Sequence, residues 1–101
     1  MRLLLLATAA LLASSASFAS TELAQKNTCL ACHAVDRKVV GPAFQDVSRK
    51  YAGQKDAQAA LARNIKAGGA GKWGPVPMPA QSALSEADAS TLAAWVLAGA
   101  K

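Results

Sequence analysis

Cysteine and histidine occur together at one point of the chain. Cys29, Cys32 and His33 form the run Cys-Leu-Ala-Cys-His, and the sequence holds no other cysteine or histidine. Two thiols three positions apart on a turn of helix can add to the two vinyl groups of a single haem, and the adjacent imidazole can then ligate the iron. The run therefore predicts one covalently attached haem c, with His33 as an iron ligand.

Three other sites can use this spacing, and the residues alone leave them open. A thioredoxin-like redox pair requires a βαβ surrounding, but strand signals are poor throughout the chain. A tetrahedral zinc site needs about four ligands, whereas Cys29, Cys32 and His33 supply three. A disulfide between the two cysteines would close a very short loop and contribute little stability. Covalent haem is the interpretation that we favour.

A methionine in a stiff loop is the favoured candidate for the second axial position of the iron, with lysine and water as the alternatives. Met78 is the only methionine besides Met1, and it lies in Gly-Pro-Val-Pro-Met-Pro at residues 74–79. Proline fixes φ near −65° and removes a backbone donor, so this loop is stiff before any ligand binds. Stiffness lowers the entropy cost of holding a weak thioether ligand.

The N-terminus has the pattern of a secretory signal peptide. Met1-Arg2 gives a positive start, residues 3–12 form an apolar run broken by Thr8, and residues 17–19 offer small side chains at positions −3 and −1 of a cleavage site. Ten helical residues span about 15 Å, too short for a hydrocarbon core of about 30 Å. We predict a cleaved segment 1–19, one domain at 20–101, export and no stable membrane insertion.

The composition of residues 20–101 indicates a domain that needs stabilisation beyond its hydrophobic core. Only 18 of these residues are Val, Ile, Leu, Met, Phe, Trp or Tyr, and 19 are alanine. Such a small core, with at most one disulfide, favours a metal or bound cofactor. Ten Lys and Arg stand against six Asp and Glu without forming one block, so nucleic-acid binding is not expected.

The elements that must position these residues are helical. Asp56 is a candidate N-cap, and Gly68-Gly69 is a stop signal. Ser85 with Asp88 resembles a capping box before a last helix, of which Leu92, Trp95, Val96 and Gly99 should line one side. The other predicted helices are Thr21–Asn27, Phe44–Tyr51 and Ala57–Ala67. Long connections at 34–43 and 68–83 complete an all-α domain.

From Ser20 onward the chain resembles the small bacterial class I cytochromes c of the cytochrome c-551 group. The likeness lies in the Cys-x-x-Cys-His run, in Gly-Pro-Ala at 41–43, in Lys-Trp-Gly-Pro-Val-Pro-Met-Pro at 72–79, and in the last helix. The resemblance implies the class I cytochrome c fold, with short helices wrapped around one covalently bound haem.

The resemblance also implies roles for individual residues. His33 would be the proximal iron ligand and Met78 the distal one, and the Pro42 carbonyl would accept the second ring N–H of His33. The Trp73 indole N–H would reach a haem propionate.

Two positions depart from the family's pattern. Relatives often have Pro-Met-Pro-Pro-Asn, so the amide near the methionine sulfur would here come from Gln81. Asn64 stands where some relatives carry a basic residue near a propionate.

The function implied is a monomeric periplasmic carrier of one electron, and not an enzyme. Its partners would be redox proteins of respiration, such as a nitrite reductase or a terminal oxidase, bound transiently and partly by charge. The alternatives are a haem enzyme or gas-binding protein in which Met78 is labile, and an accessory subunit of a larger oxidase or reductase.

Overall fold

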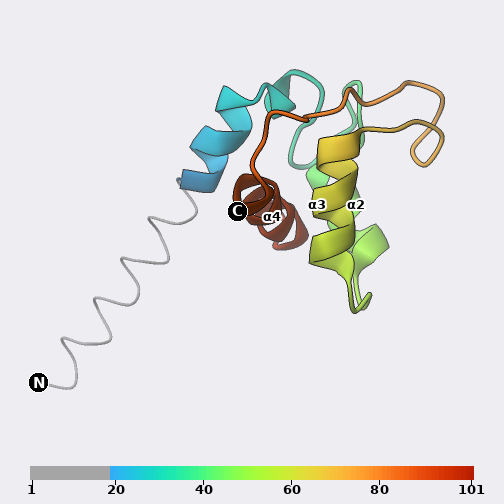
Figure 1. Cartoon of the computed structure of the whole chain (residues 1–101). Coiled ribbons are helices and arrows are strands. Elements are labelled where there is room, and N and C mark those ends of the chain that lie inside the picture. Colours follow the sequence, from blue (N-terminus) through green and yellow to red (C-terminus); the bar gives the residue numbers. More distant parts are fainter. Residues whose placement is uncertain (1–18) are drawn as a thin grey trace, which may run out of the picture.

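The computed structural model describes residues 19–101, and Figure 1 shows them as helices joined by long connections. Residues 1–18, which hold nearly all of the predicted signal peptide, lie outside the described residues. The elements in order are a helical segment at 19–26, the 3₁₀ turn η1 (Cys29–Ala31), α2 (Phe44–Tyr51), α3 (Ala57–Ala67) and α4 (Glu86–Leu97). From residue 19 on there is no β-strand, so the all-α prediction is confirmed.

The first helical segment differs slightly from its predicted bounds of 21–27. It already includes residues 19 and 20, and it ends at residue 26, where Asn27 and Thr28 form a turn. Thr28 has φ 60°, a left-handed conformation that β-branched residues rarely adopt. This turn directs the chain into η1.

Helix α2 has the predicted bounds because its apolar residues share one face. Phe44, Val47 and Tyr51 recur at helical spacing and are all buried. Asp46 in the first turn and Arg49 in the last turn complement the helix dipole. The same helix therefore supplies one wall of the core.

Helix α3 also keeps its predicted bounds, and Asp56 lies at its N-cap as predicted. The Asp56 side chain, however, accepts no capping hydrogen bond. The backbone carbonyl of Asp56 instead accepts the Ala60 N–H at 2.9 Å. Gly68 ends the helix with φ 67°, as the glycine pair predicted.

The last helix, α4, begins with the expected cap. Ser85 Oγ accepts the Asp88 backbone N–H at 3.0 Å. The prediction that Gly99 lines this helix is wrong, because Gly99 lies beyond Leu97, the last residue of α4, and has φ 92°. Its backbone N–H donates to the Val96 carbonyl at 2.9 Å and so helps to end the helix.

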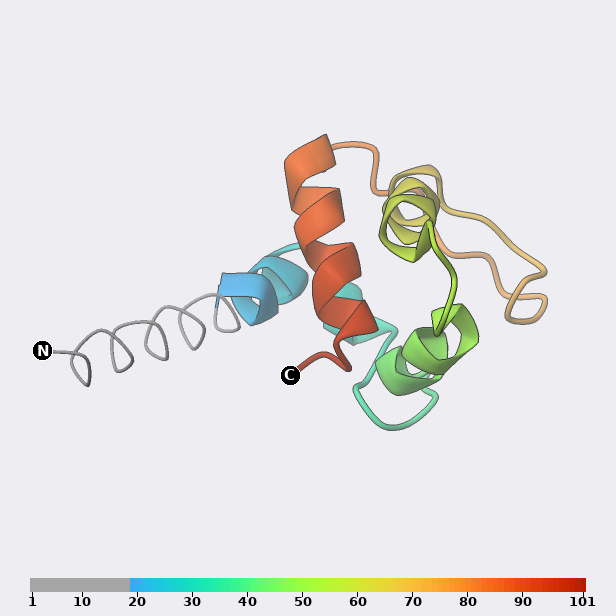
Figure 2. The ribbon, with the colours of Figure 1, turned by 90° about the horizontal axis from the view of Figure 1, so that it is seen from below.

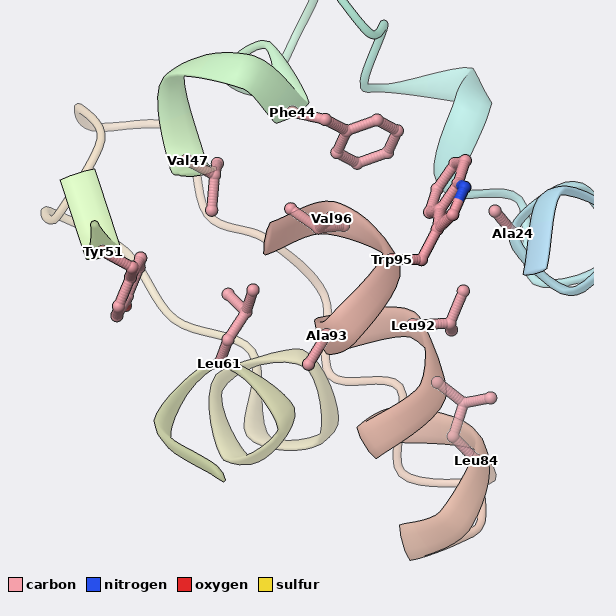
Figure 3. Packing of buried hydrophobic residues seen from close by; sticks show 10 residues of the cluster. All are labelled: Ala24, Phe44, Val47, Tyr51, Leu61, Leu84, Leu92, Ala93, Trp95 and Val96. Atoms are coloured by element: carbon pink, nitrogen blue, oxygen red, sulfur yellow. The ribbon is translucent and has the colours of Figure 1, made fainter. Parts of the chain in front are cut away.

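The core forms around α4, which packs against both α2 and α3. Figure 2 shows the N-terminal helical segment on the other side of α4, and in Figure 3 Ala24 of that segment lies beside Trp95. Trp95 also meets the Phe44 ring edge-on, with centroids 5.3 Å apart. Within residues 19–101, no helix is long and apolar enough to cross a membrane.

Candidate haem site

One cavity of about 310 Å³ collects most of the predicted site residues. The turn around η1 contributes three of them, and the connections after it and after α3 contribute the rest. Those on its wall are Cys29, Cys32, His33, Pro42, Trp73 and Met78. Gln81 is not on the wall, and its backbone N–H donates to the Ile65 carbonyl at 3.1 Å. A contact between its side chain and the Met78 sulfur stays a prediction.

The two cysteines are presented by a tight turn. The backbone N–H groups of Cys32 and His33 both donate to the Cys29 carbonyl, at 3.2 and 3.0 Å. Both thiols are free and half-buried. Burial raises the pKa of the Cys29 thiol above its ordinary value; a backbone hydrogen bond opposes the rise, and the nearby Cys32 thiol reinforces it. The turn therefore offers two neighbouring thiols to one cavity.

The imidazole of His33 is held on three sides. Its Nδ1–H donates to the Pro42 carbonyl at 2.7 Å, so the lone pair lies on Nε2. The ring stacks on Phe44 with centroids 5.1 Å apart. At Gly41 a Cβ atom would lie 2.5 Å from His33 Cε1, so only glycine allows the backbone to approach the ring this closely. These contacts fix the ring and its tautomer, as is typical of metal-ligating histidines.

Met78 lies in a loop whose two ends are tied together. Gly69 and Met78 exchange backbone hydrogen bonds of 2.7 and 3.1 Å. A Cβ at Gly68 would lie 2.5 Å from the Met78 carbonyl oxygen, so this glycine allows a close backbone contact. The sequence predicted a stiff loop from its prolines, and the structure adds a backbone clamp across its base.

Trp73 lies in the same loop, at the edge of the cavity. Its side chain is half-exposed, and the Lys50 ammonium lies 4.6 Å from the ring centroid. A cation over an indole face is attracted by the ring quadrupole. Lys50 therefore helps to hold Trp73 against the site from outside.

Sequence reasoning missed two residues of the cavity wall and noted a third only as a departure. Lys72 Nζ and Asn64 Nδ2 both lie within hydrogen-bond distance of the Tyr51 hydroxyl, at 3.0 and 2.9 Å. The three residues come from α2, α3 and the loop after α3. No local pattern links positions 51, 64 and 72, so only the folded chain reveals the cluster.

The residues of the wall fit a haem with two axial ligands. They offer two thiols for thioether bonds, an imidazole Nε2 and a thioether sulfur for iron. Most of the remaining wall is apolar, and none of the described residues on it is Asp or Glu. An apolar, acid-free wall suits a large planar macrocycle with anionic side groups.

Comparison with known proteins identifies the family of this chain. Residues 19–100 match the cytochrome c family. The chain is 54% identical over 94 residues to cytochrome c-551 of Pseudomonas aeruginosa, covering 92% of this chain and 89% of that protein. It is 50% identical over 91 residues to cytochrome c-552 of Nitrosomonas europaea, covering 90% and 88%.

Solved structures show the same fold. The crystal structure of wild-type Nitrosomonas europaea cytochrome c552 matches with a TM-score of 0.76 and 51% identity over 78% of this chain and 98% of that one. A Class 1 cytochrome of Sideroxydans lithotrophicus ES-1 matches with a TM-score of 0.68 and 28% identity over 82% and 95%. The expected class I fold is confirmed. This chain belongs to the cytochrome c family and carries covalently attached haem c.

Proposed function

We propose that this protein is a periplasmic carrier that moves one electron at a time between respiratory redox proteins, such as to a nitrite reductase or a terminal oxidase. The observation that carries the proposal is the convergence of Cys29, Cys32, His33 and Met78 on one cavity. Cys29 and Cys32 would hold the haem through thioether bonds, and His33 and Met78 would ligate its iron. The bound haem supplies the Fe(III)/Fe(II) couple.

The chain holds its donor atoms in place before and after electron transfer. The hydrogen bond from His33 to Pro42 keeps Nε2 basic and the ring oriented, and the Gly69–Met78 clamp limits movement of the thioether. With His33 and Met78 both bound to the iron, no coordination position would be left for a substrate. A fixed ligand set favours a small structural change between the two oxidation states, which suits a carrier.

The surface near the cavity suits brief contact with a redox partner. Val40, Trp73 and Val76 are large, exposed hydrophobic residues, and all three lie on the cavity wall. Lys38 and Lys72 are the charged residues of the same wall. Exposed apolar surface beside positive charge supports small, transient complexes with acidic partners, whose association rate falls as salt rises.

The test is the sixth iron ligand. The ferric protein should show the weak far-red methionine-to-iron charge-transfer band, and the ferrous protein should bind carbon monoxide slowly. Met78→Ala should keep the haem attached, abolish the band, admit carbon monoxide rapidly and lower the reduction potential, because thioether ligation favours ferrous iron. Val76→Ala, in the same loop, is the matched control and should keep the band.

A high-spin ferric spectrum with rapid carbon monoxide binding in the unaltered protein would refute the carrier and favour a haem enzyme or gas-binding protein with a labile methionine. Gel filtration of native extract addresses the remaining alternative. A carrier elutes at the mass of a monomer, whereas an accessory subunit elutes with a large complex. Reduction of candidate partners by the ferrous protein at low and high salt then identifies the acceptor.

A further inference from the structure

A buried tyrosine on the cavity wall receives two hydrogen-bond donors. Tyr51, the last residue of α2, is only 5% exposed. Its hydroxyl oxygen lies 2.9 Å from Asn64 Nδ2 and 3.0 Å from Lys72 Nζ. The Lys72 ammonium also lies 5.5 Å from the centroid of the Tyr51 ring. We refer to these three residues as the tyrosine cluster.

The two hydrogen bonds of the tyrosine cluster leave the proton of the Tyr51 hydroxyl without an acceptor within the described chain. An ammonium group and an amide nitrogen can only donate, so both hydrogen bonds use the phenol oxygen as acceptor. The Tyr51 O–H must then point to another acceptor, and none is found for it in the described part of the chain. Buried hydroxyl groups are rarely left without an acceptor. The cluster is therefore arranged to donate to a group on the cavity side.

The charges around the cavity indicate an anionic acceptor. The charged residues of the wall are Lys38 and Lys72, and its other titratable groups are Tyr51, His33 and the two cysteines of the turn. Among residues 19–101, no Asp or Glu lies on the wall to neutralise Lys72. A carboxylate can accept a hydrogen bond from the Tyr51 O–H and form an ion pair with the Lys72 ammonium group.

We propose that the tyrosine cluster binds one propionate of haem c, with Tyr51 donating its O–H and Lys72 supplying the positive charge. The inference rests on the proposed haem site and extends it to Tyr51 and Lys72, for which the sequence predicts no contact with haem. Lys72 takes over the charge compensation that the resemblance assigned to a basic residue at the position of Asn64. Asn64 instead orients the Tyr51 hydroxyl.

The proposal has a consequence for the pH dependence of the reduction potential. A nearby cation lowers the pKa of a carboxyl group, so Lys72 keeps the propionate ionised at neutral pH. Reduction removes one positive charge from the iron and raises the propionate pKa. The potential then falls with pH between the two pKa values and is flat above them. Lys72 confines that sloping range to acid pH.

The experiment measures the reduction potential of the holoprotein from acid to alkaline pH, with redox-difference infrared spectra of the protonated carboxyl group. Lys72→Met should raise the propionate pKa by about one unit, a tenfold change in proton affinity, and shift the sloping range toward neutral pH. Lys72→Arg should restore the curve of the unaltered protein. Lys55→Met is the matched control, since Lys55 is an exposed lysine that is not on the cavity wall.

Tyr51→Phe provides a second, nearly isosteric test and should shift the curve in the same direction. The proposal would be overturned if the potential of Lys72→Met varied with pH as that of Lys55→Met does, or if the carboxyl band were unchanged in Lys72→Met. Its failure is distinguishable from failure of the carrier function. If the far-red methionine band is present and only the pH response is absent, the cluster proposal alone is wrong.

Discussion

Replacing Gly41 by alanine would test the packing that orients His33. The added Cβ would lie 2.5 Å from Cε1, 2.9 Å from Nδ1 and 3.1 Å from Nε2 of the imidazole. Gly41 is not among the residues with positive φ, so alanine introduces no backbone strain at this position. The effect of the substitution is therefore purely steric and falls on one ring.

The size of the effect follows from these distances. Carbon atoms in contact lie about 3.5–4.0 Å apart, so the ring must retreat by about 1 Å. The hydrogen bond from Nδ1 to the Pro42 carbonyl is 2.7 Å long and would approach the limit of such bonds. Overpacking costs about 1–3 kcal/mol and a lost hydrogen bond about 1 kcal/mol, so we expect a loss of about 2–4 kcal/mol. For a domain of this size the Tm should fall by about 8 °C or more.

The assay combines thermal unfolding with the reduction potential and the ferric spectrum. Loss of the Pro42 hydrogen bond makes His33 a weaker donor to iron, so the potential and the ligand-field bands should shift as the Tm falls. Gly53→Ala is the matched control, because Gly53 has φ 77° and no atom within 4 Å of its added Cβ. Backbone strain should cost that variant about 1 kcal/mol of stability without changing the spectrum.

An unchanged potential and spectrum in Gly41→Ala would refute the reasoning, because they would mean that the ring and its hydrogen bond tolerate the added methyl group. A shift of equal size in Gly53→Ala would also contradict it. In that case, the spectral changes would come from general loosening of the fold rather than from contact with His33.

Two further substitutions test local features of the fold. Thr28→Asn should raise the free energy of unfolding by about 1 kcal/mol, because asparagine tolerates the left-handed φ of 60° better than a β-branched residue; a lower Tm would show that the turn is not strained. Ser85→Ala should lower it by about 1 kcal/mol through loss of the α4 cap, whereas Ser82→Ala in the exposed turn before it should leave the Tm unchanged.

The helices could be predicted from the sequence wherever local signals agree. Alanine-rich composition and a terminal glycine pair define α3, and the apolar spacing of Phe44, Val47 and Tyr51 defines α2. The contacts of single residues at the helix ends were predicted less well, because one residue type can play more than one structural role there. Asp56 stands at an N-cap without capping, and Gly99 ends the last helix rather than packing along it.

The haem site could be predicted only where its residues are close together in the sequence. Cys29, Cys32 and His33 are adjacent in sequence, so their spacing alone carries the chemistry. The loop around Met78 was identified by its prolines, but its clamp to Gly69 depends on the folded backbone. The contact between Tyr51 and Lys72 joins positions 21 residues apart and has no sequence pattern.

The core and the cofactor site of this protein share the same side chains. Eight buried residues of the core also form the cavity wall: Ala24, Phe44, Val47, Tyr51, Leu61, Leu92, Trp95 and Val96 (Figure 3). A contact that holds haem c in place therefore also stabilises the fold, and binding energy becomes folding energy. This coupling explains why a chain with so few bulky apolar residues can form a domain. It also requires that substitutions on the wall change stability and potential together, whereas substitutions at Thr28 or Ser85, away from the wall, change stability alone.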